Sequence, residues 1–220
     1  NKIDKSLIEN DIINKINNSQ AEFLIFAENN YPYLVSDLNN ISIMKHLKND
    51  QKIIIGSTRI ENNKFYNSFL FLEKNNIQIF DKQILVPFGE FLPLRSYLKF
   101  MEKITGNVDF APGIHKRLIQ SNDINVLPVV CYEIIFNKIL KDVNKNKIDI
   151  LINITNDSWF GNQFGPYQHF YHSRMRALIS KKYLVRVSNN GISSIIDNNG
   201  KILNFINLNT KAKLTNIVEI

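Results

Sequence analysis

The chain has 220 residues, 44% of them hydrophobic and 21% charged, which suits one globular domain able to bury about 70% of its unfolded surface. The formal net charge is +7, but the lysines are scattered and form no cluster with arginines and aromatic residues, so we expect no nucleic-acid partner. No run of about 18 apolar residues occurs, so we expect no membrane-spanning helix within these residues.

The first third of the chain predicts two helices and four strands. An amphipathic pattern over 6–17 predicts the first helix, with Ser6 as its N-cap, and inward apolar residues predict the second at about 36–48. Strands are expected at 22–27, 52–57, 65–72 and 77–80. The last two are expected to pair across the polar turn 73–76, and the alternation of helix and strand favours an α/β fold.

Residues 82–116 show no clear period and contain three prolines and three glycines. An irregular segment of this length in a compact domain is usually functional. Its apolar side chains surround Arg95, Lys99 and Lys103, which leaves two interpretations open. The segment either packs its apolar residues into the core, or it is an amphipathic arm that lies on a membrane with its cations near lipid phosphates.

The second half predicts a further sheet. A hairpin of 117–120 with 126–130 leads into a helix that ends near 142, and the apolar strand 148–154 is expected at the sheet centre, covered on both faces. Pro166 opens a helix to about 182. Strands are expected at 183–188, 192–197 and 201–206, separated by two Asn-Asn-Gly turns, with a last strand at 211–220.

Cys131 stands at the junction between the apolar strand 126–130 and the predicted helix. It is the only cysteine, so no internal disulfide can form, and either burial or chemistry must explain it. The unpaired N–H groups of a helix N-terminus would favour its thiolate.

Two other apolar strands end on charged side chains. Glu28 follows the strand 22–27, while Lys82 and Glu90 bracket an apolar turn after the strand 77–80. A carboxylate, an ammonium and a thiol brought together at strand ends form a base, an electrophile and a nucleophile. Each of them taken alone is more often an ordinary surface charge or a small buried residue.

Glu28, Lys82 and Cys131, in this order and context, resemble the Glu-Lys-Cys triad of the carbon–nitrogen hydrolase (nitrilase) superfamily. More narrowly, four stretches resemble the extracytoplasmic domain of the bacterial apolipoprotein N-acyltransferase family: 85–93, 131–136, 156–161 and 168–178. The resemblance implies that 1–220 is a single domain with a nitrilase-like α-β-β-α sandwich, in which mixed sheets are flanked by helices. The family fold normally begins one strand earlier, which leaves open whether one sheet lacks its first strand.

The resemblance also implies roles for these residues. Cys131 would be the nucleophile, Glu28 the general base and then acid, and Lys82 the oxyanion stabiliser, aided by the backbone N–H of Tyr132.

Supporting residues follow from the same resemblance. Glu90 would orient Lys82 or bind the incoming amine, and Glu133 would act at the site unless it is only a favourable acid in a first helical turn. Tyr132 matches the aromatic residue that follows the cysteine in the family, although packing explains it equally well. Asp157 and Trp159 would shape a pocket wall.

The implied reaction moves a fatty acyl group from a membrane phospholipid to Cys131 as a thioester and then to the N-terminal amine of a diacylglyceryl-cysteine apolipoprotein. The implied location is the bacterial inner membrane, with this domain facing the periplasm. Because the sequence starts at Asn1 rather than Met, we expect a piece of a longer polytopic membrane protein. No cofactor or metal is expected: His169 and His172 lie one helical turn apart, but no third ligand accompanies them.

Two alternative functions remain open at the level of sequence. A soluble amidase or nitrilase would use the same triad and let water resolve the intermediate. A non-catalytic remnant would keep the fold only as a binding surface.

Overall fold

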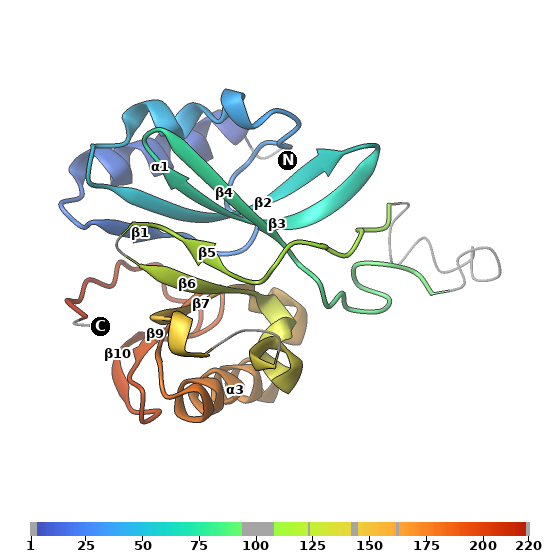
Figure 1. The fold of residues 1–220 in the computed structure, drawn as a ribbon, viewed down its shortest axis with the longest axis vertical. Helices are drawn as coiled ribbons and strands as arrows, with labels where there is room; N and C mark the ends of the chain where they lie inside the picture. The colour runs from blue at the N-terminus through green and yellow to red at the C-terminus, as the bar shows by residue number, and fades with distance from the viewer. Residues whose placement is uncertain (1–3, 94–107, 123, 142–144, 162, 219–220) are drawn as a thin grey trace.

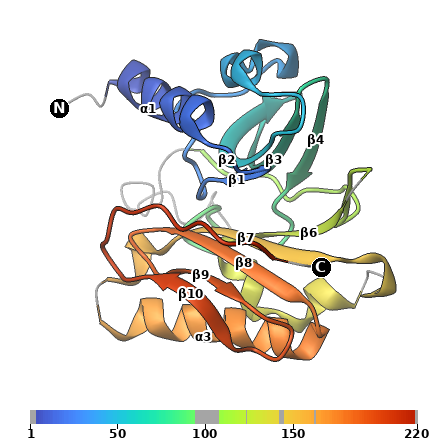
Figure 2. The ribbon, with the colours of Figure 1, turned by 90° about the vertical axis from the view of Figure 1, so that its left-hand side faces the viewer.

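The computed structural model describes residues 4–93, 108–122, 124–141, 145–161 and 163–218. Two β-sheets stack face to face, with helices on both outer faces (Figure 1). Helix α1 (Lys5–Asn18) covers the first sheet and helix α3 (Phe164–Ser180) covers the second, as the turned view in Figure 2 shows. The expected α/β fold and its α-β-β-α layering are therefore confirmed.

The first sheet has the order β1-β2-β3-β4. Its strands are β1 (Phe23–Ile25), β2 (Lys52–Glu61), β3 (Lys64–Glu73) and β4 (Asn76–Asp81). β1 pairs parallel with β2, and the other neighbours are antiparallel, which confirms the predicted hairpin between β3 and β4.

The second sheet has the order β10-β9-β8-β7-β6-β5. Its strands are β5 (Ile119–Gln120), β6 (Asn125–Val130), β7 (Ile150–Asn156), β8 (Tyr183–Asn189), β9 (Ser193–Ile196) and β10 (Ile202–Ile206). β6, β7 and β8 are parallel, so their carboxyl ends share one edge of the sheet. β7 lies between the other two and is almost entirely buried, as its apolar sequence predicts.

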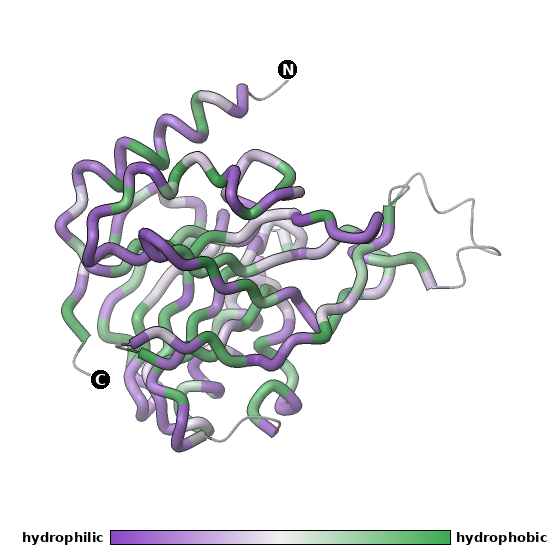
Figure 3. The backbone as a smooth tube through the Cα atoms, turned by 45° about the horizontal axis from the view of Figure 1, so that its top comes forward, coloured by the Kyte–Doolittle hydropathy of each residue, from purple (hydrophilic) through white to green (hydrophobic). Residues whose placement is uncertain are grey.

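Successive side chains along a strand pack alternately into two different hydrophobic cores. In β2, Ile54 packs between the sheets, while Ile53 and Ile55 pack under α1. In β6, Val130 points between the sheets and Val129 points toward α3. Because both faces of these strands are buried, consecutive residues along them are apolar, and the tube in Figure 3 accordingly shows hydrophobic stretches inside the molecule.

Two predicted α-helices are wrong in type. The segment expected as a helix at 36–48 forms two 3₁₀ helices, η1 (Leu38–Asn40) and η2 (Ser42–His46). The segment after Val130 also forms 3₁₀ helices, η4 (Cys131–Ile135) and η5 (Asn137–Leu140). Two further 3₁₀ turns are η6 (Lys145–Lys147) and η7 (Asp157–Phe160).

The break between η4 and η5 has a physical cause in α3. The guanidinium of Arg176 donates to the backbone carbonyl of Ile134 at 2.7 Å and also to that of Ile135. In a continuous helix these carbonyls would accept from backbone N–H groups further along the chain. Because they accept from Arg176 instead, the helix is interrupted, and Phe136 adopts an extended conformation.

Smaller differences concern element ends. The N-cap of α1 is Asp4, which accepts from the Ser6 N–H at 2.9 Å, rather than Ser6 itself. β2 runs on to Glu61 instead of ending at Ser57, because Asn62 and Asn63 both adopt positive φ and make a tight turn into β3. Residues 211–218 contain no strand, contrary to expectation. No helix in the described part of the chain is long and apolar enough to cross a membrane.

Candidate active site

Glu28, Lys82 and Cys131 are brought together at one edge of the sandwich from three different strands. Glu28 follows β1, Lys82 follows β4, and Cys131 follows β6, so both sheets contribute. All three are buried, with 5%, 1% and 7% of their surface exposed. Burial of two ionisable groups and a thiol together requires that they satisfy one another.

Asn67 of β3 links the two carboxylates of this group. Its amide nitrogen donates to Glu28 Oε1 at 2.7 Å and to Glu90 Oε1 at 2.9 Å. Glu90 Oε2 in turn lies 2.7 Å from Lys82 Nζ. Glu90 therefore contacts the lysine directly, as one of its two expected roles requires. Asn67 was missed by sequence reasoning, although a polar residue within the apolar stretch 65–72 was a usable signal.

Burial and the neighbouring charged groups shift the pKa values of Glu28 and Lys82. Burial raises the pKa of Glu28 above its usual value, and the nearby Lys82 ammonium and Asn67 amide only partly offset this. Burial also disfavours the Lys82 ammonium, but the Cys131, Glu28 and Glu90 groups outweigh it and raise the pKa of Lys82. Lys82 thus stays charged at neutral pH, while the raised pKa of Glu28 makes its carboxylate easier to protonate.

Cys131 has a strained backbone, with φ at +52°. A non-glycine residue in this region costs on the order of 1–2 kcal/mol and persists only where its surroundings enforce it. Burial, followed by the Glu28 charge, raises the pKa of the thiol to about 12. The expected thiolate is therefore not favoured, because the helix that follows is a short 3₁₀ turn in a buried, acidic setting. The cysteine rests as a thiol beside a carboxylate.

Glu133 is fully buried and connects two segments of the site. It pairs with Arg117, whose Nη2 lies 2.6 Å from Glu133 Oε1. The same carboxylate accepts from the backbone N–H groups of Gln83, Ile84 and Val130 at 2.9–3.0 Å. Although burial opposes it, the Arg117 pair and these N–H groups hold the pKa of Glu133 below its usual value. Glu133 thereby ties the chain after Lys82 to the residue before Cys131.

A second buried polar cluster lies on the α3 side of Cys131. Asp157 Oδ1 lies 2.8 Å from His169 Nδ1, and Asp157 Oδ2 accepts from Arg186 Nη2 at 2.6 Å. The His169 bond and the Arg186 charge overcome burial and lower the pKa of Asp157 to about 2. Asp157 is 1% exposed, and its carboxylate also accepts from the Thr155 hydroxyl at 3.2 Å, so it is fully engaged by buried partners. Sequence reasoning did not select Arg186, and it assigned His169 no role.

Aromatic side chains lie beside Cys131. The Tyr132 ring packs against the rings of Phe136, Phe160 and His169, with centroids 5.9–6.0 Å apart. Trp159, on the turn after β7, is 75% exposed. Tyr132 is thus packed beside the site, and Trp159 presents its ring to the outside.

Gly56 allows the Glu28 segment to lie close to β2. A Cβ atom at this position would come within 2.5 Å of the Glu28 Cα and the Asn29 nitrogen. We therefore expect Gly56→Ala to lower the free energy of unfolding by about 1–3 kcal/mol and to displace Glu28. Urea denaturation measures the first effect. Gly89→Ala is the matched control, since its nearest neighbour is a side-chain atom 3.5 Å away, and an equal loss in both variants would contradict the argument.

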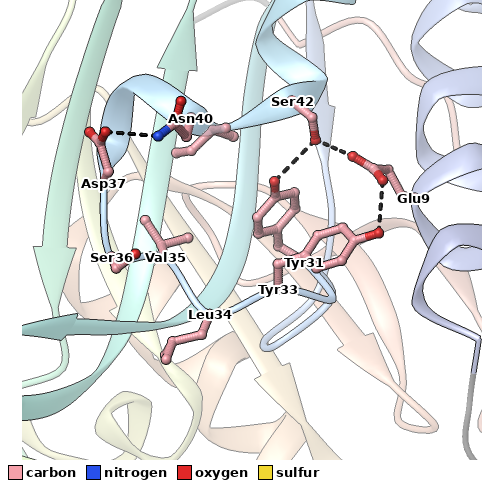
Figure 4. A pocket seen from close by; sticks show the side chains of 10 residues that line it. Glu9, Tyr31, Tyr33, Leu34, Val35, Ser36, Asp37, Asn40 and Ser42 are labelled. Atoms are coloured by element: carbon pink, nitrogen blue, oxygen red, sulfur yellow. Dashed lines mark hydrogen bonds between the residues drawn. The ribbon is translucent and has the colours of Figure 1, made fainter.

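A cavity of about 290 Å³ lies elsewhere, between α1 and the loop that precedes η1 (Figure 4). In it, Glu9 accepts from the Tyr33 hydroxyl at 2.9 Å and from Ser42, and the Ser42 hydroxyl also contacts Tyr31. The polar groups of this cavity satisfy each other and fasten α1 to η2. None of the predicted site residues lines it.

The fold and the buried carboxylate, lysine and cysteine define a class of protein. The Carbon-nitrogen hydrolase family model matches residues 18–220, and the chain belongs to this family. Solved structures agree on the fold: a CN-hydrolase superfamily protein from Xanthomonas campestris has a TM-score of 0.66 at 14% identity, covering 92% of this chain and 79% of its own. Nit3 of Saccharomyces cerevisiae, from the nitrilase superfamily, has a TM-score of 0.63 at 17% identity, covering 93% and 78%.

Within this class, the chain is similar in sequence to apolipoprotein N-acyltransferases. That of Rickettsia prowazekii is 37% identical over 178 residues, covering 77% of this chain and 36% of the relative. That of Wigglesworthia glossinidia brevipalpis is 37% identical over 215 residues, covering 92% and 43%. The chain therefore spans about two fifths of the length of these relatives.

Proposed function

We propose that the protein is an acyltransferase that uses Glu28, Lys82 and Cys131 to move a fatty acyl group from a phospholipid to the N-terminal amine of an apolipoprotein. The observation that carries this proposal is the burial of these three side chains together, with Asn67 hydrogen-bonded to Glu28 and Glu90 paired with Lys82. The similarity to apolipoprotein N-acyltransferases supplies the substrate class.

In the first step the Cys131 sulfur attacks the ester carbonyl of the phospholipid. The thiol proton passes to Glu28 as the carbon–sulfur bond forms, and the oxyanion is stabilised by Lys82 and the Tyr132 backbone N–H. Breakage of the ester carbon–oxygen bond releases a lysophospholipid, which takes the proton from Glu28. A thiol with a pKa of about 12 needs this base, because almost none of it is ionised at neutral pH.

In the second step the N-terminal amine of the apolipoprotein attacks the thioester. Glu28 takes the proton of the amine, the carbon–sulfur bond breaks, and the sulfur regains a proton from Glu28. The Glu90–Lys82 ion pair keeps the lysine pointed at the reacting carbonyl through both steps. The amine must react with the thioester before water does, which favours an opening above Cys131 from which water is excluded.

The surroundings of the site support a membrane-surface partner. Several large apolar side chains are exposed on the segments that follow β4 and β7, namely Phe88, Ile114, Trp159 and Phe164. Part of the segment 82–116, the proposed lipid-contacting arm, lies at 94–107 and so outside the described residues. In this proposal the 220 residues are the single catalytic domain of a longer inner-membrane protein and face the periplasm, where lipid and acceptor meet.

The proposal is tested by the intact mass of the protein after incubation with detergent-dispersed phosphatidylethanolamine. We expect a gain of one fatty acyl group that is removed by hydroxylamine and is absent from Cys131→Ala. A folded wild-type protein that gains no mass but releases ammonia from small amides would be an amidase instead. A folded protein with neither activity would refute catalysis by this site.

A further inference from the structure

The backbone carbonyl of Cys131 is held by two buried side chains. His169 Nε2 lies 3.3 Å from this oxygen and Asn153 Nδ2 donates to it at 3.4 Å. His169 is 3% exposed and Asn153 is fully buried. The Cys131 carbonyl and the Asp157 carboxylate both only accept hydrogen bonds, so hydrogen bonds at both ring nitrogens require His169 to be an imidazolium, with a proton on Nε2 and another on Nδ1.

Both side chains are fixed by partners of their own. Nδ1 of His169 faces Asp157 at 2.8 Å and Arg186 Nη2 at 3.2 Å. Arg186 also donates to Asn153 Oδ1 at 2.7 Å, so one guanidinium supports both groups. An imidazole and an amide locked in this way have little freedom to leave the Cys131 carbonyl.

The rigid peptide bond links the orientation of the Cys131 carbonyl to that of the Tyr132 N–H. In a trans peptide the carbonyl of one residue and the N–H of the next point in opposite directions within one rigid plane. Fixing the Cys131 oxygen therefore fixes the direction of the Tyr132 N–H. Donors on the oxygen also polarise the amide and strengthen its N–H as a donor. The first N–H groups of a helical turn have no acceptor within that turn, which leaves this one available.

We propose that His169 is a positioning residue that, with Asn153, orients and polarises the Cys131–Tyr132 peptide so that the Tyr132 N–H binds the oxyanion. This rests on the proposed function, because it assigns a support to the oxyanion donor of that reaction. It also accounts for the positive φ of Cys131, which the surrounding contacts must enforce.

Two reagents for the same thiol separate this role from a merely structural one. Acylation of Cys131 by p-nitrophenyl butyrate passes through a tetrahedral oxyanion, whereas alkylation by iodoacetamide does not. In His169→Phe we expect the acylation rate to fall on the order of tenfold or more while the alkylation rate stays within about twofold. His169→Gln, which keeps an N–H donor, is expected to recover part of the lost acylation.

The control is His172→Phe, an exposed histidine one turn further along α3, which should change neither rate. A parallel fall of acylation and alkylation in both His169 variants would overturn the inference, since it would mean general distortion of the site. Unchanged acylation in both would overturn it too. If the wild-type protein is alkylated but never acylated, the proposed function itself fails.

Discussion

Glu28→Gln is expected to slow acylation of Cys131 by a factor of about 10²–10⁴, because Glu28 is the carboxylate that interacts with the thiol and would take its proton. The same change is expected to lower the pKa of the thiol, since the Glu28 charge is one of the causes that raise it. The variant should thus have a more acidic cysteine and a slower reaction. Lys82→Met should raise the thiol pKa further, because the Lys82 ammonium lowers it.

The measurement is the iodoacetamide alkylation rate from pH 7 to 10, followed beside the acylation rate. The curve for Glu28→Gln should lie at lower pH than that of the wild type, and the curve for Lys82→Met at higher pH. Asp50→Asn removes an exposed carboxylate and is the control for a simple loss of charge. Acylation within tenfold of the wild type in Glu28→Gln, or a shift of its curve to higher pH, would refute the assigned base.

Arg117→Leu is expected to lower the free energy of unfolding by about 3–5 kcal/mol, because it leaves the fully buried Glu133 carboxylate without its charged partner. Arg117 also donates to the Pro128 carbonyl at 2.9 Å and stacks over the Phe80 ring, so packing is lost as well. Urea denaturation at pH 7 measures the loss. Arg174→Leu, which removes a hydrogen bond to the Gly200 carbonyl and a distant contact with the Tyr171 ring but no ion pair, should cost only about 1 kcal/mol.

The pH dependence of this loss has a definite sign. In the wild type the pKa of Glu133 is lowered, so its contribution to stability is present above pH 4.5 and is lost as pH falls through the lowered value. Without Arg117 that pKa rises, so the difference between variant and wild type should shrink from pH 7 to 4.5. Arg117→Leu combined with Glu133→Gln should be more stable than Arg117→Leu alone. A constant difference across this range would rule out an unpaired carboxylate as the cause.

The sequence predicted the parts of the fold that local signals determine. The two Asn-Asn-Gly turns join β8 to β9 and β9 to β10 as expected, and the apolar run of β7 lies at the sheet centre. The ends of β1, β4 and β6 carry the three predicted side chains to one edge. Their roles remain predictions that the experiments above address.

The two helices predicted with the wrong type differ in whether the sequence carried the signal. In the segment 36–48 the inward residues Leu38, Ile41, Met44 and Leu47 are each three apart, which matches the three residues per turn of a 3₁₀ helix better than the α period. That signal was present in the sequence. The break after Ile135 was not, because it depends on Arg176 from a helix some 40 positions later.

The supporting residues of the site were hidden for a similar reason. Arg117 and Arg186 lie in or beside strands, where alternation makes a charged residue look solvent-facing. Only their partners Glu133 and Asp157, distant in sequence, show that they point inward. Buried ion pairs of this kind cannot be inferred from either member alone.

The bonds around Glu28 also bear on the order in which the molecule folds. Asn189, at the end of β8, donates to the Glu28 carbonyl across 161 positions of sequence, and Asn67 reaches the Glu28 carboxylate across 39. Contacts so far apart in the chain close late, after the local hairpins have formed. During synthesis Cys131 and Glu28 therefore remain separate until nearly the whole domain has emerged, and they come together only as the two sheets close on each other.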